Sequence, residues 1–170
     1  MIVLVGFMGA GKTTVGHLLS RRLGLPFADS DQVIQERAGR QVRQIFAEEG
    51  EPAFRALEHQ VIAELLAGPD LVLALGGGAA EHPQTRRGLA RHQVIYLQVG
   101  YAEVLRRVGG DSGRPLLARP DLAALYHRRL AAYEEVATLT VGTGARSPDA
   151  IGEEILARLA RVPAAEGRAP

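Results

Sequence analysis

The first twenty residues contain an apolar run, a glycine-rich stretch and a helical pattern, with no gap between them. Residues 2–5 are apolar and mostly β-branched, as is typical of a parallel strand covered on both faces. Residues 6–13, GFMGAGKT, match the pattern GxxxxGKS/T, and a helical pattern runs over residues 12–23. A strand, a glycine loop and a helix in this order predict a phosphate-binding P-loop; the alternative is a turn without a ligand.

The loop residues have distinct expected roles in holding a nucleotide. Gly6, Gly9 and Gly11 permit backbone angles that side chains would forbid, so successive amides can point at phosphate oxygens. The positive end of the following helix favours the same anion. We expect Lys12 to contact the β- and γ-phosphates and the hydroxyl of Thr13 to ligate Mg²⁺. The predicted ATP-binding set is Gly9, Ala10, Gly11, Lys12, Thr13 and, as a weaker candidate for the metal, Thr14.

Lys12 is the only lysine among the twenty basic residues, and the other nineteen are arginines. A compact ammonium on a thin stem fits inside a loop wrapped around phosphates, where a planar guanidinium does not. The single lysine therefore stands at a position where the two cations are not interchangeable.

The composition is that of an ordinary globular domain, with 46% apolar and 23% charged residues in a chain of 170. The net charge of +1 gives no general attraction to nucleic acid or to a membrane. The absence of cysteine excludes thiol catalysis and cysteine-ligated zinc, and the five histidines have no metal-binding spacing. We expect a cytoplasmic monomer with one domain over residues 1–162, a disordered tail over 163–170, and no nucleic acid or membrane partner.

Two carboxylates follow the second expected strand, residues 25–28. Asp29 and Asp31 stand at its carboxyl end, where ligands of open α/β sheets bind. The alternative is that Ser30 or Asp31 only caps the helix that follows. The third expected strand, residues 71–75, ends in glycines at the point where many P-loop proteins carry a magnesium-orienting aspartate. Because no acid stands there, Asp29 is the predicted replacement.

The region between these strands, residues 41–67, has a helical pattern interrupted by Gly50 and Pro52, which predicts two helices and a corner. Arg55 and Glu58 are three residues apart in the second helix. This spacing is most often that of an exposed ion pair worth roughly a few tenths of a kcal/mol, and the alternative is a role in binding.

Two glycine-rich segments are further candidates for the site. Gly76, Gly77 and Gly78 would let a ligand approach backbone amides, or would form a flexible turn. Residues 109–118 combine three glycines with Arg114, which predicts a lid that closes over the nucleotide; the alternative is a plain surface loop. The remaining expected elements are helices at 83–91, 102–108, 121–136 and 148–161, and strands at 94–99 and 138–141.

Between residue 2 and about residue 160 the chain contains, in this order, the stretches GFMGAGKTT, FADSD, FRALE, LGGGA, GRPLL, RRLAAYEEVA and TGARSPD. This order and spacing resemble those of the shikimate kinases. The P-loop alone is shared with many NTPases, but the DSD, FR, GGG and RPLL elements together are specific to this family. The resemblance implies a three-layer α/β P-loop NTPase fold with a five-stranded parallel sheet of order 2-3-1-4-5, flanked by helices, and a lid loop.

The resemblance further implies transfer of the γ-phosphate of MgATP to the 3-hydroxyl of shikimate, a small carboxylate with three hydroxyls. By motif, Asp31 would bind the ring hydroxyls and accept a proton, and Arg55 and Arg129 would hold the carboxylate. The implied catalytic residues are Lys12, Asp31 and Arg114. The implied shikimate-binding residues are Asp31, Phe46, Phe54, Arg55, Gly76, Gly77, Gly78 and Arg129, within or beside a helical region over about residues 31–62. Arg107 and Arg146 would contact adenine, Arg114 would reach the phosphates, and Thr13 with Asp29, directly or through water, would hold Mg²⁺.

Two other functions remain open from the sequence. A gluconate kinase would share the P-loop but should lack both the DSD placement and the paired arginines for a carboxylate. A catalytically silent nucleotide-binding module would keep the fold, but it would have no need of Lys12, Thr13, Asp29, Asp31 and Arg114 together.

Overall fold

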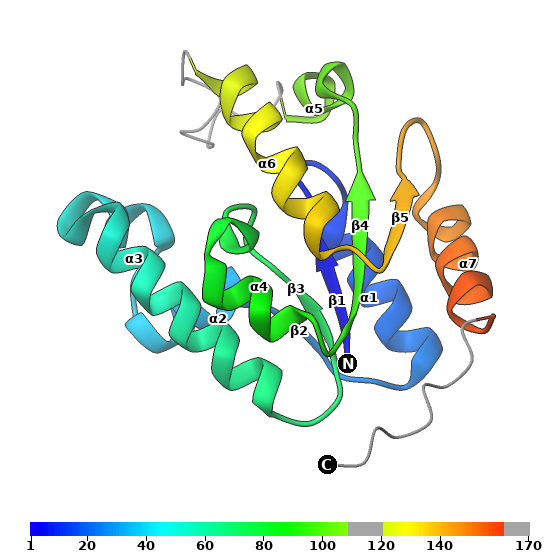
Figure 1. The fold of residues 1–170 in the computed structure, drawn as a ribbon, viewed down its shortest axis with the longest axis horizontal. Helices are drawn as coiled ribbons and strands as arrows, with labels where there is room; N and C mark the ends of the chain where they lie inside the picture. The colour runs from blue at the N-terminus through cyan, green and yellow to red at the C-terminus, as the bar shows by residue number, and fades with distance from the viewer. Residues whose placement is uncertain (109–120, 162–170) are drawn as a thin grey trace.

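The computed structural model describes residues 1–108 and 121–161, and its five strands form one parallel sheet (Figure 1). The order is β2-β3-β1-β4-β5, which confirms the order implied by the resemblance. All strands therefore present their carboxyl ends at the same edge. The strands are β1 (Ile2–Val5), β2 (Phe27–Asp29), β3 (Val72–Ala74), β4 (Gln93–Gln98) and β5 (Leu139–Gly142).

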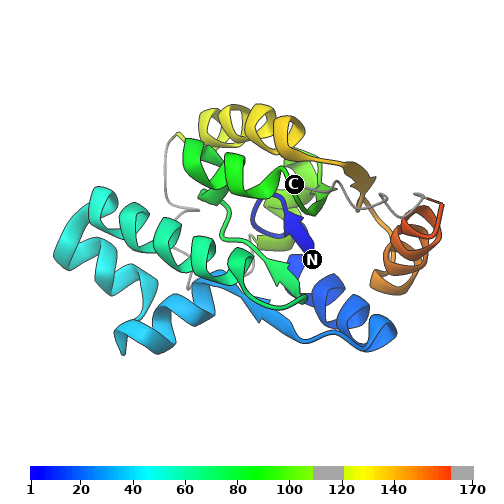
Figure 2. The same cartoon turned by 60° about the horizontal axis from the view of Figure 1, so that its bottom comes forward.

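Helices cover both faces of the sheet, with α4 and α6 on one side and α1 beside α7 on the other (Figure 2). This arrangement explains why β1 is apolar throughout: Val3, Leu4 and Val5 are completely or almost completely buried. The helices are α1 (Lys12–Leu23), α2 (Ser30–Ala38), α3 (Val42–Ala67), α4 (Pro83–Leu89), α5 (Tyr101–Val108), α6 (Leu122–Val136) and α7 (Pro148–Leu159), with a short 3₁₀ helix η1 (Ala79–Glu81).

Helices α2 and α3 lie beside the β2 edge of the sheet and pack on each other (Figure 1). They have a small apolar cluster of their own, formed by Ile34, Ile45, Phe54 and Val61. The expected corner in this region is confirmed at Gly50, whose φ of 81° and ψ of 168° interrupt the helical backbone of α3. Glycine is suited to this position because side chains rarely adopt positive φ.

The predicted lid, residues 109–118 with Arg114, and the predicted tail, residues 163–170, lie outside the described residues. In the two stretches of chain that the structure does describe, we find no helix with the length and apolarity needed to span a membrane.

Candidate active site

The P-loop connects β1 to α1 at the carboxyl edge of the sheet. Gly6, Gly9 and Gly11 have φ values of 148°, 76° and 91°, so all three glycines adopt the positive backbone angles predicted for this loop. Gly6 is restricted in addition by β4, because a Cβ atom there would lie 2.6 Å from the carbonyl oxygen of Leu97. The loop therefore has no room for a larger residue at its start.

The side chain of Lys12 turns back along this loop. Its Nζ donates hydrogen bonds to the carbonyl oxygens of Gly6, at 2.7 Å, and Phe7, at 3.3 Å. These bonds hold the ammonium beside the loop that is expected to surround the phosphates. The helix α1 begins at the same point, so a cation and a helix N-terminus are combined there.

Asp29 connects the P-loop helix to α2. Its Oδ2 accepts a hydrogen bond from the Thr13 hydroxyl at 3.2 Å, and its Oδ1 accepts one from the backbone amide of Asp31 at 3.0 Å. Asp29 therefore caps the N-terminus of α2, and the alternative prediction that Ser30 or Asp31 is the cap is wrong. Capping and facing the P-loop are not exclusive, because the two oxygens of one carboxylate serve the two roles.

Asp31 is half-buried and surrounded by charge. The pKa of its carboxyl is raised to about 6, mainly by burial and next by the nearby carboxylates of Glu58 and Asp29, against the lowering effect of Lys12 and Arg55. Asp31 is thus ionised at neutral pH but close to its titration range. A carboxylate in this condition is suited to accept a proton.

The three glycines after β3 each lie beside a charged side chain, which a Cβ atom would crowd at Gly76 and Gly78 and would meet only in ordinary van der Waals contact at Gly77. A Cβ on Gly76 would lie 2.5 Å from Oδ1 of Asp31 and 2.8 Å from a carboxylate oxygen of Glu58. On Gly78 it would lie 2.5 Å from both terminal nitrogens of Arg55, and on Gly77 it would lie 3.4 Å from Nη1 of Arg129. None of the three has a positive φ. The triple glycine is therefore not simply a flexible turn, because it allows charged side chains to approach the backbone.

Ser30 anchors the same glycines from the opposite side. Its hydroxyl is completely buried and accepts a hydrogen bond from the amide of Gly76 at 2.9 Å. This bond joins the start of α2 to the end of β3 across the strand pair. The sequence indicated Ser30 only as a possible helix cap, so this role was missed.

Arg55 is held by two acids and two aromatic rings, and the outer acid is Glu51, which accepts from Nη2 at 3.2 Å. Its Nη1 donates to Glu58 at 2.6 Å, and its guanidinium carbon lies 5.3 Å from the ring centre of Phe54 and 5.8 Å from that of Phe46. Glu58 is only 2% exposed, so the prediction of an exposed pair is wrong. The signal was present, since Glu58 lies at helical spacing from Phe54 and Ile62 on the buried stripe of α3.

Arg129 reaches the glycines from α6. It is 6% exposed, and its Nε donates to Glu81 at 2.8 Å. Tyr133, one turn later in the same helix, donates its hydroxyl to the carbonyl oxygen of Gly77. The structure thus brings together Asp31, Arg55, Arg129 and the triple glycine, although they come from four separate parts of the chain.

A family model described as shikimate kinase matches residues 8–160 of this chain. The chain belongs to the shikimate kinase family. A shikimate kinase from Thermobifida fusca (strain YX) is 50% identical to it over 162 residues, which cover 94% of each chain. The structure of a shikimate kinase from Acinetobacter baumannii in complex with shikimate has a TM-score of 0.88 at 40% identity, covering 94% of this chain and 92% of that one. A shikimate kinase from Aquifex aeolicus has a TM-score of 0.84 at 34% identity, over 94% and 95% of the two chains.

Members of the shikimate kinase family are ATP-dependent kinases, so this chain is an enzyme of that class. Family membership disfavours both a gluconate kinase and a silent nucleotide-binding module. Which residues carry the shikimate kinase chemistry in this chain is a separate question, and its answer depends on the geometry described above.

The two arginines implied to contact adenine are both engaged with the protein. Arg107 donates to the carbonyl oxygen of Gly9 at 2.9 Å and to Glu103 at 2.6 Å, so it joins the P-loop to α5. Arg146 donates to Glu154 at 2.6 Å and to the carbonyl oxygen of Gly142 at 3.1 Å. Contacts of either residue with adenine remain predictions.

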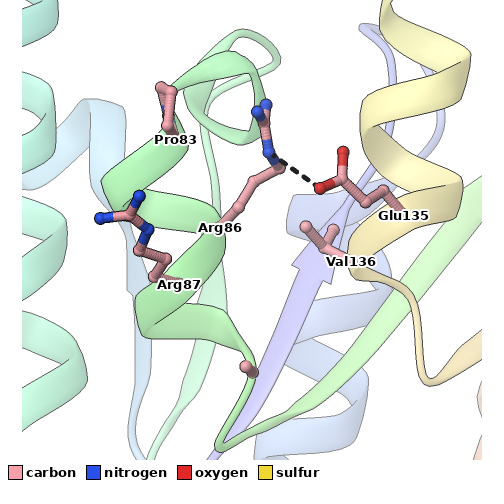
Figure 3. A pocket seen from close by; sticks show the side chains of 6 residues that line it. Pro83, Arg86, Arg87, Glu135 and Val136 are labelled. Atoms are coloured by element: carbon pink, nitrogen blue, oxygen red, sulfur yellow. Dashed lines mark ion pairs between the residues drawn. The ribbon is translucent and has the colours of Figure 1, made fainter.

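A separate hollow of about 390 Å³ lies between α4 and α6 (Figure 3). Pro83, Arg86 and Arg87 line it from α4, and Glu135 and Val136 line it from the end of α6; an ion pair of 3.3 Å joins Arg86 to Glu135. None of the predicted site residues lines this hollow, so it is distinct from the candidate active site.

Proposed function

We propose that this chain transfers the γ-phosphate of ATP to the 3-hydroxyl of shikimate, with Asp31, Arg55 and Arg129 as its acceptor site. One observation carries this proposal: the two arginines and Asp31 all face Gly76–Gly78, next to the P-loop. Two cations suit a carboxylate, and one anion suits hydroxyl groups. A small hydroxylated acid is the acceptor that matches all three.

Arg55 and Arg129 would hold the substrate carboxylate by charge-assisted hydrogen bonds. Both guanidinium groups are already fixed by a carboxylate and an aromatic ring, Arg55 by Glu58 and Phe54, and Arg129 by Glu81 and Phe7. Binding would therefore cost little ordering of these long side chains.

Asp31 would accept the proton of the reacting hydroxyl, because it is ionised above a pKa of about 6. Lys12 and the N-terminus of α1 would stabilise the charge on the transferring phosphoryl group. Since the transition state of phosphoryl transfer is loose, positioning and charge neutralisation would supply most of the rate.

Mg²⁺ fits the donor set at the P-loop. Thr13 and Asp29 offer a hydroxyl and a carboxylate oxygen 3.2 Å apart, and oxygen is the ligand atom that Mg²⁺ prefers. Within residues 1–108 and 121–161 there is no cluster of three or more His, Cys, Asp or Glu side chains that could hold a metal. The protein would therefore supply only a few of the oxygen ligands of the ion. Such an ion would neutralise phosphate charge. The monomeric state and the cytoplasmic location remain predictions from the sequence.

The acceptor is tested by measuring ADP release with shikimate, quinate and gluconate as parallel substrates. We expect turnover with shikimate and a kcat/KM at least about 100-fold lower for the other two, because a site built for particular polar groups rejects compounds that leave those groups unpaired. Gluconate used as well as shikimate would contradict the proposal and favour a sugar-acid kinase.

The carboxylate clamp is tested by Arg55→Ala and Arg129→Ala. Each change is expected to raise the KM for shikimate by a factor that corresponds to roughly 2 to 4 kcal/mol, with little change in the KM for ATP, because a charge-assisted bond to the acceptor is lost. Arg128→Ala is the matched control, since Arg128 immediately precedes Arg129 in α6 but its side chain is 62% exposed. An unchanged KM for shikimate in both clamp variants would show that these arginines do not bind the acceptor.

A further inference from the structure

Glu81, the last residue of η1, joins the loop after the triple glycine to α6. Its Oε2 accepts a hydrogen bond from Nε of Arg129 at 2.8 Å, and its Oε1 accepts one from Nε of Arg128 at 3.0 Å. One acid thus uses its two oxygens for two adjacent arginines. These arginines differ in their surroundings, because Arg129 is buried and Arg128 is exposed.

The bond from Nε determines how the guanidinium of Arg129 is turned. A guanidinium has donors on Nε and on both terminal nitrogens, in one rigid plane. Glu81 occupies the Nε donor, whereas Nη1 lies toward Gly77. Within the described residues, neither Nη1 nor Nη2 donates a hydrogen bond to the protein. The terminal donors are therefore left for a ligand at the triple glycine.

A second acid lies near the same arginine. Burial raises the pKa of Glu58 above its usual value, and the charges of Arg55 and then of Arg129 act in the opposite direction. Glu58 is the acid that holds Arg55. Without Glu81, the buried Arg129 would lose the only hydrogen-bond acceptor that it has among the described residues. Its guanidinium would then be attracted to Glu58 and would move away from Gly77. This shift would also weaken the ion pair between Glu58 and Arg55.

Glu81 is ionised under ordinary conditions. Burial alone would raise its pKa, but hydrogen bonds from Arg129 and Arg128 lower the pKa below its usual value. The acid can therefore act as a permanent anchor for a guanidinium. Its position at the end of η1, the short helix that follows the triple glycine, keeps this anchor close to the loop that it serves.

We propose that Glu81 is a positioning residue for substrate recognition, which holds Arg129 by Nε so that the terminal nitrogens face the substrate carboxylate. This inference rests on the proposed function. It assigns no contact between Glu81 and the substrate, and it predicts that Glu81 affects binding of the carboxylate only.

The opposite effect is also physically possible, because an anion near the site repels an anionic substrate. Positioning should dominate, since Glu81 is already neutralised by two arginines and its bond is made to a buried donor. The sign of the change in KM therefore separates the two effects: loss of positioning raises KM, whereas relief of repulsion lowers it.

The test compares Glu81→Gln with Arg129→Ala and Arg128→Ala in the full chain. Glutamine keeps the shape of the side chain but removes the charge that fixes the guanidinium. We expect Glu81→Gln to raise the KM for shikimate about tenfold, because a charge-assisted hydrogen bond is replaced by a weaker one to a neutral acceptor, with kcat and the KM for ATP within about twofold of the starting protein. Arg128→Ala should change none of these values by more than about twofold.

A second substrate separates positioning from general damage. The methyl ester of shikimate keeps the ring and hydroxyls but lacks the charge that Arg129 would hold. We expect Glu81→Gln to lower kcat/KM about tenfold for shikimate but less than about twofold for the ester. A structural defect would lower both equally, and that result would overturn the inference.

The remaining outcomes assign the failure to one proposal or the other. If Arg129→Ala raises the KM for shikimate and Glu81→Gln leaves it unchanged or lowers it, Glu81 is not a positioning residue, although the clamp stands. If Arg129→Ala leaves the KM unchanged, both the clamp and the role of Glu81 are contradicted.

Discussion

Lys12→Ala is expected to lower kcat about 10³-fold while the affinity for shikimate changes little. The reason is position: Nζ of Lys12 lies at the carbonyl oxygens of Gly6 and Phe7 in the P-loop, whereas the proposed acceptor site is at the triple glycine. The lost charge would stabilise the transferring phosphoryl group and not the acceptor. The measurements are kcat by coupled ADP release and shikimate binding by isothermal titration calorimetry.

Lys12→Arg is the informative companion, because it keeps the charge and changes only its shape. We expect it to be almost as inactive as Lys12→Ala, since a planar guanidinium does not fit in a loop whose carbonyl oxygens are 2.7 and 3.3 Å from a compact ammonium. Equal losses of kcat and of shikimate affinity in Lys12→Ala would contradict the assignment. An active Lys12→Arg would show that charge alone is sufficient at this position.

Asp31→Asn is expected to lower kcat about 10²- to 10⁴-fold. The amide keeps the shape of the side chain but cannot accept a proton from the substrate hydroxyl. Destabilisation is not expected to explain the loss. The raised pKa means that the folded protein binds this proton more tightly than the unfolded chain, so stability falls as the pH rises from 3.8 to about 6, and the ionised carboxylate opposes folding fully above that range. The melting temperature of Asp31→Asn at pH 8 should therefore not fall below that of the starting protein.

The same pKa predicts the acid limb of the pH profile. Protonated Asp31 cannot accept a proton, so kcat/KM for shikimate should fall about tenfold for each pH unit below about 6. Asp31→Asn should lack this limb, because it has no carboxyl group to titrate there. Near-normal turnover of the variant with only a raised KM would reassign Asp31 from proton acceptor to substrate binding.

Local patterns were sufficient for the P-loop and for the corner in α3. The angles of Gly9 and Gly11 are local properties of a short motif, and Gly50 interrupts the helix by its own backbone conformation. The strand β1 was also predictable, because four consecutive apolar residues at the start of a P-loop have one common structural use. These features depend on residues close together in the chain.

The surroundings of Glu58 could not be predicted in the same way. Its spacing from Arg55 is that of a surface pair, but the helix packs so that Glu58 lies against Gly76 and raises the pKa of Asp31. Three elements must be placed in space before this contact exists. The only local sign of this buried contact was that Glu58 stands at helical spacing among apolar residues, on the stripe of α3 that the structure buries.

The sequence by itself determined the class of fold, the phosphate-binding loop and the family, and the resemblance to that family implied Asp31, Arg55 and Arg129 as acceptor residues. Tertiary structure alone decided which acid fixes Arg129: the spacing of three residues already indicated Glu58 as a partner of Arg55, whereas Glu81 is forty-eight residues from Arg129. That second pair forms because the sheet order places the loop after β3 against α6. Contacts of such long sequence separation depend on how the elements pack, and no local spacing pattern indicates them.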